Sequence, residues 1–393
     1  MIFNSFWYFI LFLVPAAILF RVVRPAAQPW VCLLFGAGFF VFFSLMEIGG
    51  VAGAFCLLIF VWEAAFSRLY RPGSAFCFVG IAQAIIFLLI FKYWNFFSGL
   101  IFRPTGHNPV YWAGAFLPLG ISFFTFEFIH YAVDRYRGTA PAGKFGEYMA
   151  FILFFPTMVA GPIKRYQDFG PKLAQPSLAW ELDWQQGVTR ILVGLAKKFM
   201  LADLLTAFTN HLNHGDIALA ARWVLPLWLL AYGFKIYFDF SAYSDIAIGS
   251  ARLFGIKVPE NFDWPYLRTN ISEFWQHWHM SLYKWLVDYV FIPLGGSRTN
   301  RPRVYLNVLI TMLISGLWHG AGMHFVVWGL WHGLLLVIYR FWSEWRKNHG
   351  GPPTVAGKIC GWALTFLMVN LGWAFFCMDL PTAWFFFKRL FLG

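Results

Sequence analysis

The stretch VYLNVLITMLISGLWHGAGMHFVVWGLWHGLLLVIY, residues 304–339, runs for 36 residues without a formally charged side chain. Three of its residues are histidines, namely His319, His324 and His332. An apolar run of this length is typical of a segment inside a lipid bilayer, where about 20 residues cross the hydrocarbon. Ionisable side chains at membrane depth are costly, and they usually face a cavity, a pathway or a partner group. The histidines therefore indicate a functional site inside a membrane protein.

The composition of the whole chain indicates the same class. Of the 393 residues, 60% are hydrophobic and 12% are charged, and the mean hydropathy is +0.61. A soluble domain carries about 25% charged residues. At about 20 apolar residues per span, this length fits one bundle of about 10–11 transmembrane helices. We predict an all-α polytopic bundle over residues 1–393, with re-entrant and interfacial helices around a central funnel and no soluble domain.

The net charge of +12 fits basic cytoplasmic loops of a polytopic protein. The chain has none of the interleaved basic and aromatic residues of a nucleic-acid module, so we expect no nucleic-acid partner. The five cysteines have neither CxxC spacing nor close pairing, so we expect small buried side chains and no metal or disulfide. They are Cys32, Cys56, Cys77, Cys360 and Cys377.

Apolar runs along the chain predict the individual helices. Residues 6–20 follow an uncharged N-terminus and precede Arg21 and Arg24, so we expect a retained first helix with an external N-terminus and not a signal peptide. Residues 29–66 are long enough for two helices hinged near Gly49. Further spans are predicted at 75–102, 110–132, 148–162, 188–208, 223–238, 304–319, 325–339 and 359–376. The run 383–392 is too short to cross a bilayer alone.

Two regions do not resemble plain spans. Residues 154–162 contain Pro156 and Pro162, which remove backbone donors, so we expect this segment to bend or re-enter. Residues 235–298 mix acidic, basic and aromatic side chains, and such a segment is tolerated at membrane depth only where it lines a cavity or packs inside protein. We predict short interfacial and re-entrant helices there around a polar-lined chamber, with Asp239 neutralised by Lys235 at i,i+4.

His319 is the leading candidate for chemistry. It lies in SGLWHG, residues 315–320, between Gly316 and Gly320, which would let a substrate or a helix come close. A general base at this position would take a proton from an attacking hydroxyl. The apolar run fits two other roles equally well, a core histidine hydrogen-bonded between helices or a pore lining.

His279 is the second candidate, in EFWQHWHMS, residues 273–281. The segment is amphipathic at helical spacing, and His277 is expected to have a structural role. On a helix the two histidines would diverge by about 200°, so they could not share one metal ion. His332, on a continuous helix, would lie some 140° away from His319, so we expect it to cap or brace. No GxSxG, Walker, GxGxxG or HExxH motif appears.

Ordered motifs give a family resemblance over about residues 60–340. They are YGFKIYFDFSAYSD (232–245), NF (261–262), FWQHWHMS (274–281), YVFIPLGG (289–296) and GLWHG (316–320). In this order they resemble the bacterial polysaccharide branch of the membrane-bound O-acyltransferases (MBOAT). The upstream segments LGISFFTF (119–126), DRYRG (134–138) and AGPI (160–163) resemble the alginate O-acetylase type, with the D-alanyl-lipoteichoic acid transferases as near relatives.

The resemblance implies roles for particular residues. The histidine of the Trp-His-Gly motif is the catalytic one in that family, which corresponds to His319, and the second polar residue of the active site corresponds to His279. Substrate-channel and supporting residues are expected at Trp318, Gly316, Gly320, Asp239, Ser241, Asp245, Glu273, Trp275, Gln276, Trp278 and His332.

The resemblance also implies the reaction. An acyl group, with acetyl favoured, would pass from a cytoplasmic thioester such as acetyl-CoA or an acyl carrier to a hydroxyl of a cell-envelope polysaccharide, or to an extracytoplasmic acyltransferase partner protein. The expected location is the bacterial cytoplasmic (inner) membrane, with no cofactor or metal. The chain ends soon after Phe391, which is nearer the length of the D-alanyl transferases acting on teichoic acids, so D-alanyl transfer is the alternative.

Two other classes of protein fit parts of the sequence. A transporter with a histidine-containing pathway would use the charged pairs of residues 235–298 as gates or proton relays. Transporters usually show repeated halves or paired broken helices, and the sequence shows no such repeat. A non-catalytic scaffold for envelope enzymes would account for the spans, but it would leave the buried histidines without a role.

Overall fold

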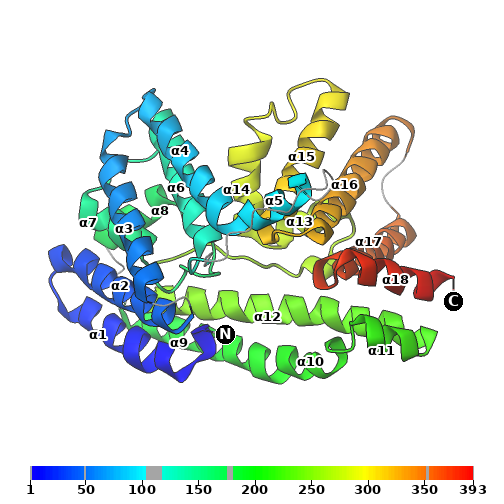
Figure 1. Ribbon diagram of the computed structural model, residues 1–393, viewed down its shortest axis with the longest axis horizontal. Coiled ribbons are helices and arrows are strands. Elements are labelled where there is room, and N and C mark those ends of the chain that lie inside the picture. Colours follow the sequence, from blue (N-terminus) through cyan, green and yellow to red (C-terminus); the bar gives the residue numbers. More distant parts are fainter. Residues whose placement is uncertain (1, 48–49, 103–116, 175–179, 351–353, 393) are drawn as a thin grey trace. The chain divides into compact units, whose positions relative to one another are not determined.

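The computed structural model describes residues 2–47, 50–102, 117–174, 180–350 and 354–392. Every regular element in these ranges is a helix, and the single β-type contact is an isolated bridge between Phe262 and Trp278. The predicted all-α fold is therefore confirmed for the described part of the chain (Figure 1).

The chain forms two compact units. Unit 1 contains Met1–Leu195 and Tyr243–Pro259, and unit 2 contains Ala196–Ala242 and Glu260–Gly393. One boundary falls within helix α12, Leu225–Leu253, whose first part belongs to unit 2 and whose second part belongs to unit 1.

Unit 1 packs its helices around a core rich in phenylalanine. Its helices include η2 (Tyr8–Leu13), α1 (Val14–Val22), α2 (Gln28–Glu47), α3 (Gly50–Phe66), α4 (Ala75–Leu88), η5 (Leu89–Tyr93), α5 (Trp94–Phe102), α6 (Ile121–Arg137), α7 (Phe145–Ile152), α8 (Tyr166–Ala174) and α9 (Trp180–Ala196). In the core, the Phe39 ring lies 5.5 Å from that of Phe155, and Phe155 is buried together with its neighbour Phe154.

The proline-containing segment of unit 1 bends as predicted. Helix α7 ends after eight residues, and turns follow through residues 153–160. Because Pro156 and Pro162 cannot donate backbone hydrogen bonds, the helix does not continue. The chain leaving these turns carries Lys164, whose ammonium pairs with Glu127 of α6 and lies 4.6 Å from the centre of the Phe151 ring.

Unit 2 contains the motifs at 261–262, 274–281, 289–296 and 316–320 and most of the motif at 232–245, whereas the upstream motifs at 119–163 belong to unit 1. The elements of unit 2 are η7 (Lys197–Ala202), α10 (Asp203–Thr209), α11 (His214–Leu219), the first part of α12, η9 (Pro265–Leu267), α13 (Ile271–His277), α14 (Met280–Leu286), η10 (Val287–Phe291), α15 (Arg301–His319), α16 (Met323–His349), α17 (Val355–Cys377) and α18 (Leu380–Phe391). The elements between α12 and α15 are short, whereas α16 and α17 have 27 and 23 residues.

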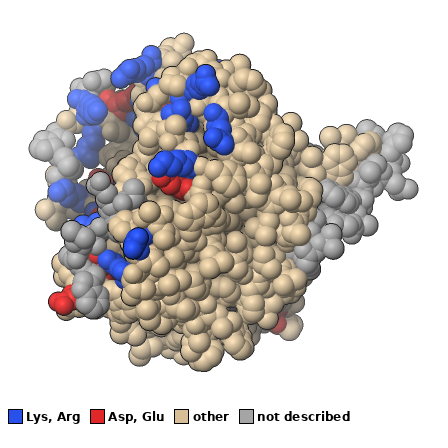
Figure 2. Space-filling model, turned by 90° about the vertical axis from the view of Figure 1, so that its left-hand side faces the viewer, with Lys and Arg blue, Asp and Glu red and all other residues tan. Residues whose placement is uncertain are grey.

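The membrane character of the chain is confirmed by its helices. Among the described residues, four helices are long and apolar enough to cross a bilayer, at Pro25–Met46, Ala75–Phe102, Met323–Lys347 and Val355–Cys377. The face drawn in Figure 2 is largely uncharged, and Lys and Arg gather over its upper part. The chain is therefore a multi-pass membrane protein, and the larger number of spans expected from the sequence stays a prediction.

Two expectations for residues 235–298 are wrong. The first part of this region is not a set of short helices, because α12 runs unbroken for 29 residues through Leu253. Asp239 is also not neutralised by Lys235. Instead Lys198 Nζ lies 2.9 Å from Asp239 and 2.6 Å from Asp203, while Lys235 Nζ donates to Thr209 Oγ1 over 3.0 Å. Asp239 and Lys235 are therefore each engaged by a residue of another helix, and not by each other. The later part of the region is short and broken as predicted.

Helices α15 and α16 approach each other through glycines. A Cβ added to Gly316 of α15 would meet the Phe325 carbonyl oxygen and would lie 3.1 Å from Gly329 Cα on α16. A Cβ on Gly329 would in turn lie 2.5 Å from the Met312 carbonyl oxygen. The two backbones are therefore in direct contact, as small residues permit between membrane helices.

We expect Gly316→Ala to lower the stability of the protein by about 1–3 kcal/mol, because its new methyl group would overpack this contact. The matched control is Gly38→Ala in α2, where the added Cβ would lie 3.8 Å from the Phe12 ring and fits without movement. Melting temperatures in detergent should fall for the first variant and stay level or rise for the second. Equal melting temperatures would contradict the direct backbone contact.

Candidate active site

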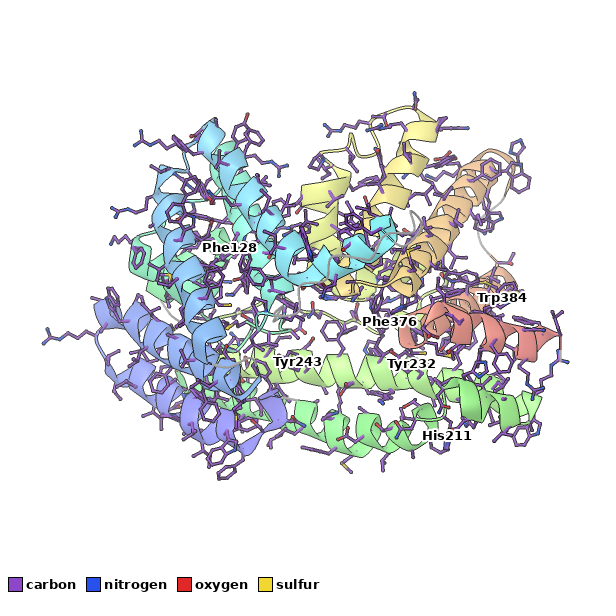
Figure 3. All side chains as sticks on the ribbon, viewed as in Figure 1. Phe128, His211, Tyr232, Tyr243, Phe376 and Trp384 are labelled. Carbon is purple, nitrogen blue, oxygen red and sulfur yellow. The ribbon has the colours of Figure 1, made fainter. Side chains whose placement is uncertain are left out.

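His319 is the last residue of α15 and is surrounded by aromatic rings. Its ring centre lies 4.9 Å from that of Trp318, 5.1 Å from Trp328 and 5.0 Å from Phe376. Phe325 stacks further away at 6.4 Å. Phe376, labelled in Figure 3, lies near the end of α17. These four residues, called the aromatic box below, hold His319 in an apolar setting while leaving it partly exposed.

His279 occupies a break between two short helices. Helix α13 ends at His277, α14 begins at Met280, and the backbone of His279 is left-handed with φ of 47°. Such a conformation is rare for a residue other than glycine and often marks a functional site. Residues 273–281 therefore do not form the single helix that their amphipathic pattern indicates.

Hydrogen bonds from Asn261 fix this break. The Asn261 carbonyl oxygen accepts from the backbone N–H of Met280 over 2.9 Å, and its side-chain Oδ1 accepts from Ser281 Oγ over 2.6 Å. The adjoining bridge between Phe262 and Trp278 holds the other side. The NF and FWQHWHMS motifs, separated in the sequence by residues 263–273, thus together fix the backbone of His279.

The Trp318 ring contacts the rings of both His279 and His319. The His279 ring lies 6.0 Å from that of Trp318 and 4.6 Å from Phe240, and only 2% of the residue is exposed. Neither ring nitrogen of His279 has a hydrogen-bond partner within the described residues. The two predicted catalytic residues are therefore brought to one place, although they come from different helices.

A cavity of about 400 Å³ reaches this place within unit 2. Its buried part is lined by His279, Trp275 and Ser315, and its exposed part by Arg340, Glu344 and Lys347. Ser315 Oγ is buried and has no hydrogen-bond partner among the described residues. The sequence had not singled out Ser315, Arg340 or Lys347, because nothing in their local pattern shows that α15 and α16 line one cavity.

His332 lies behind the aromatic box. It is fully buried, and its ring lies 5.1 Å from that of Trp275 and 5.0 Å from that of Trp328, which itself contacts His319. Neither ring nitrogen of His332 has a hydrogen-bond partner within the described part of the chain. This arrangement fits the bracing role expected for His332.

Other predicted residues near the site pack against or form hydrogen bonds with neighbouring side chains. Trp278 packs its ring 5.0 Å from that of Trp373. Glu273 accepts a hydrogen bond from Thr269 Oγ1 over 3.2 Å, and Gln276 is exposed and donates to Ser272 Oγ over 3.2 Å. The predicted Gly320 ends α15 in an extended conformation, and a Cβ there would meet the Phe325 ring.

The three predicted residues of α12 form ion pairs and hydrogen bonds of their own. Besides the Asp239 pair, Ser241 accepts from Lys197 Nζ over 2.9 Å. Asp245 belongs to unit 1, where it pairs with Arg190 over 2.6 Å. Asp239 and Ser241 therefore each contact a lysine of η7. Among the described residues, no group of three His, Cys, Asp or Glu side chains is arranged to hold a metal ion.

Comparisons with known proteins match this chain to one family model and to several relatives. The family model described as "MBOAT, membrane-bound O-acyltransferase family" matches residues 88–379. The probable alginate O-acetylase AlgI of Pseudomonas aeruginosa is 37% identical over 82% of this chain and 61% of its own length. The peptidoglycan O-acetyltransferase of Helicobacter pylori is 35% identical over 76% of this chain and 61% of its own length. The teichoic acid D-alanyltransferase of Bacillus subtilis is 31% identical over 82% of this chain and 84% of its own length. The chain thus spans about three-fifths of the alginate O-acetylases that it matches.

We expect His332→Leu to melt within a few degrees of the wild type, because replacing an unpaired buried polar ring by an apolar side chain of similar volume loses no hydrogen bond. His332→Ala should melt clearly lower, since it leaves a cavity beside Trp275 and Trp328. Thermal unfolding followed by tryptophan fluorescence measures both. A large loss in His332→Leu would show that the imidazole makes a polar interaction essential to the fold.

Proposed function

Because this chain belongs to the membrane-bound O-acyltransferase family, we propose that it is an O-acyltransferase of the bacterial cytoplasmic membrane. It moves an acyl group from a cytoplasmic thioester to a hydroxyl of a cell-envelope polysaccharide, directly or through an extracytoplasmic partner protein. One observation carries the proposal. Two histidines from separate motifs both contact the ring of Trp318, and His279 also lines a cavity whose outer end carries Arg340, Glu344 and Lys347.

His319 is the general base in this proposal. Its imidazole accepts the proton of the acceptor hydroxyl while the hydroxyl oxygen attacks the thioester carbonyl carbon. The new C–O bond forms, the C–S bond breaks, and the departing thiolate takes the proton back from the imidazolium. The aromatic box keeps bulk water away from His319, which favours transfer to the acceptor over hydrolysis.

His279 stabilises the charge that develops on the carbonyl oxygen. A neutral imidazole has one N–H donor, and neither nitrogen of His279 is engaged by the described residues. A donor already held in a buried, fixed position costs no reorganisation when negative charge forms. The left-handed backbone of His279 and the Asn261 hydrogen bonds provide that fixed position.

The cavity supplies a route for the donor. At its outer end Arg340 is paired with Glu344 over 3.2 Å and Lys347 is exposed. The two cations suit the phosphates of acetyl-CoA or of an acyl carrier's phosphopantetheine, because Arg and Lys are the usual phosphate ligands. The apolar walls toward His279 suit the chain that carries the thioester. The reaction needs no metal or cofactor in this scheme.

The acyl group is acetyl in the favoured form of the proposal. The O-acetyl relatives are 35–38% identical to this chain, against 31–32% for the teichoic acid D-alanyltransferases. D-Alanyl transfer to a teichoic acid-like polymer is the second candidate, supported by those same relatives. A transporter would bind the donor without breaking the thioester, so thiol release by the purified protein separates the enzyme from this alternative.

We expect His319→Ala to lower acyl transfer by about 10²-fold or more, since general-base catalysis contributes that amount. The measurement is thiol released from acetyl-CoA by purified protein supplied with acceptor. His324→Ala is the matched control, because His324 belongs to the same apolar run but packs its ring on Phe325. It should keep most of the activity. More than about a tenth of wild-type activity in His319→Ala would refute the general-base role.

For His279 we expect Ala to remove most activity and Asn to restore part of it, because an amide can still donate a hydrogen bond to the carbonyl oxygen. The loss should appear mainly in kcat, since the interaction strengthens as charge develops. Steady-state kinetics of both variants test this. If Asn and Ala were equally inactive, His279 would not act as a hydrogen-bond donor.

A further inference from the structure

A second cavity of unit 2, of about 710 Å³, lies between α16, α17 and the start of α13. We propose that it binds an anionic phospholipid, with the phosphate at Arg346 and Lys358 and an acyl chain along the apolar wall. Neither His279 nor His319 lines this cavity. The proposal is therefore independent of the acyl-transfer chemistry.

The two cations lie at the same end of two membrane-spanning helices. The candidate spans are Met323–Lys347 and Val355–Cys377. Arg346 is one residue from the end of the first span, and Lys358 is three residues from the start of the second. Basic side chains at such boundaries lie at headgroup level, where they attract anionic lipids. The N-terminus of α17 adds partial positive charge beside Lys358.

The apolar wall has the depth of one leaflet. On α16 the lining extends from Arg346 to Leu335, which is about 16 Å along a helix, and on α17 from Lys358 to Met368, about 15 Å. Half of the hydrocarbon core of a bilayer is about 15 Å. A cavity that starts at headgroup level and ends near the midplane fits one acyl chain.

The side of this cavity is accessible from the lipid. Ile338 and Leu364 line it, and they are 62% and 59% exposed. The Arg346 guanidinium lies 5.2 Å from the Trp342 ring centre, and this stacking directs the cation along the wall. Glu273 also lines the cavity, and its carboxylate accepts a hydrogen bond from Thr269 Oγ1.

Tyr339 separates this cavity from the one that reaches His279. It lines both. A soluble donor thioester and a membrane lipid would therefore lie on opposite sides of one side chain, each in the cavity whose chemistry suits it. The charged mouth of the first cavity is formed by Arg340, Glu344 and Lys347, and that of the second by Arg346 and Lys358.

The test uses the full chain in detergent with phosphatidylglycerol or phosphatidylcholine, and native mass spectrometry to count bound lipid. We expect phosphatidylglycerol to bind and to raise the melting temperature more than phosphatidylcholine does, because a ligand of the folded state stabilises it. Arg346→Gln with Lys358→Gln should weaken phosphatidylglycerol binding at least about tenfold, since each cation near an anionic headgroup contributes about 1 kcal/mol.

Two further variants keep the test independent of folding. Ile338→Trp adds bulk at an exposed wall position and should reduce binding of the acyl chain while the lipid-free melting temperature stays at the wild-type value. Lys388→Gln removes an exposed charge from α18 and should leave binding unchanged. Unchanged phosphatidylglycerol binding in the double variant would overturn the proposal. The proposal would also be overturned if inorganic phosphate raised the melting temperature as much as phosphatidylglycerol does, because the cavity would then bind a free anion. Displacement of the bound lipid by coenzyme A would overturn it too, because the cavity would then belong to the donor.

Discussion

The backbone contact between α15 and α16 determines the rest of the candidate site. Gly316 and Gly329 let the two helices touch without side chains between them. That contact places Trp328 of α16 beside His319 of α15, and His332 one turn further along behind Trp328. It also makes Ser315 and Arg340 lining residues of one cavity. In a bilayer, where lipid tails are as apolar as the helices, such close packing is a principal source of helix association.

Burial of ionisable groups in this chain follows two patterns with different consequences. Two lysines are engaged by carboxylates or hydroxyls, Lys198 with Asp203 and Asp239 and Lys235 with Thr209. His279 and His332 instead lie among aromatic rings with no hydrogen-bond partner within the described residues. A buried polar group without a partner lowers stability, so a protein that keeps one usually uses it. His279 has such a use in the proposed reaction, whereas His332 contributes packing to the aromatic box.

The two cavities of unit 2 suggest how one helical unit can serve both an aqueous donor and the surrounding lipid. Both have a cationic end and an apolar wall, and both include Tyr339. They differ in what lies at the buried end, which is His279 in one and the apolar side chains of Leu335 and Met368 in the other. In the two proposals, the same residue types serve chemistry in the cavity that His279 lines and lipid binding in the other.

The membrane class, the all-helical fold and the two histidines of the candidate site could be predicted from the sequence, because each of these depends on local features. Apolar length predicts spans, the prolines at 156 and 162 predict the bend after α7, and ordered motifs indicate the family. The sequence did not predict that His279 lies in a left-handed break, because the amphipathic pattern of 273–281 is compatible with a helix and the break depends on Asn261 from another segment. It also wrongly paired Asp239 with Lys235, since an i,i+4 spacing says nothing of the lysine that η7 brings to α12. These contacts and the walls of the cavities depend on tertiary packing, because they join residues from separate segments of the chain that have no periodic signal in common.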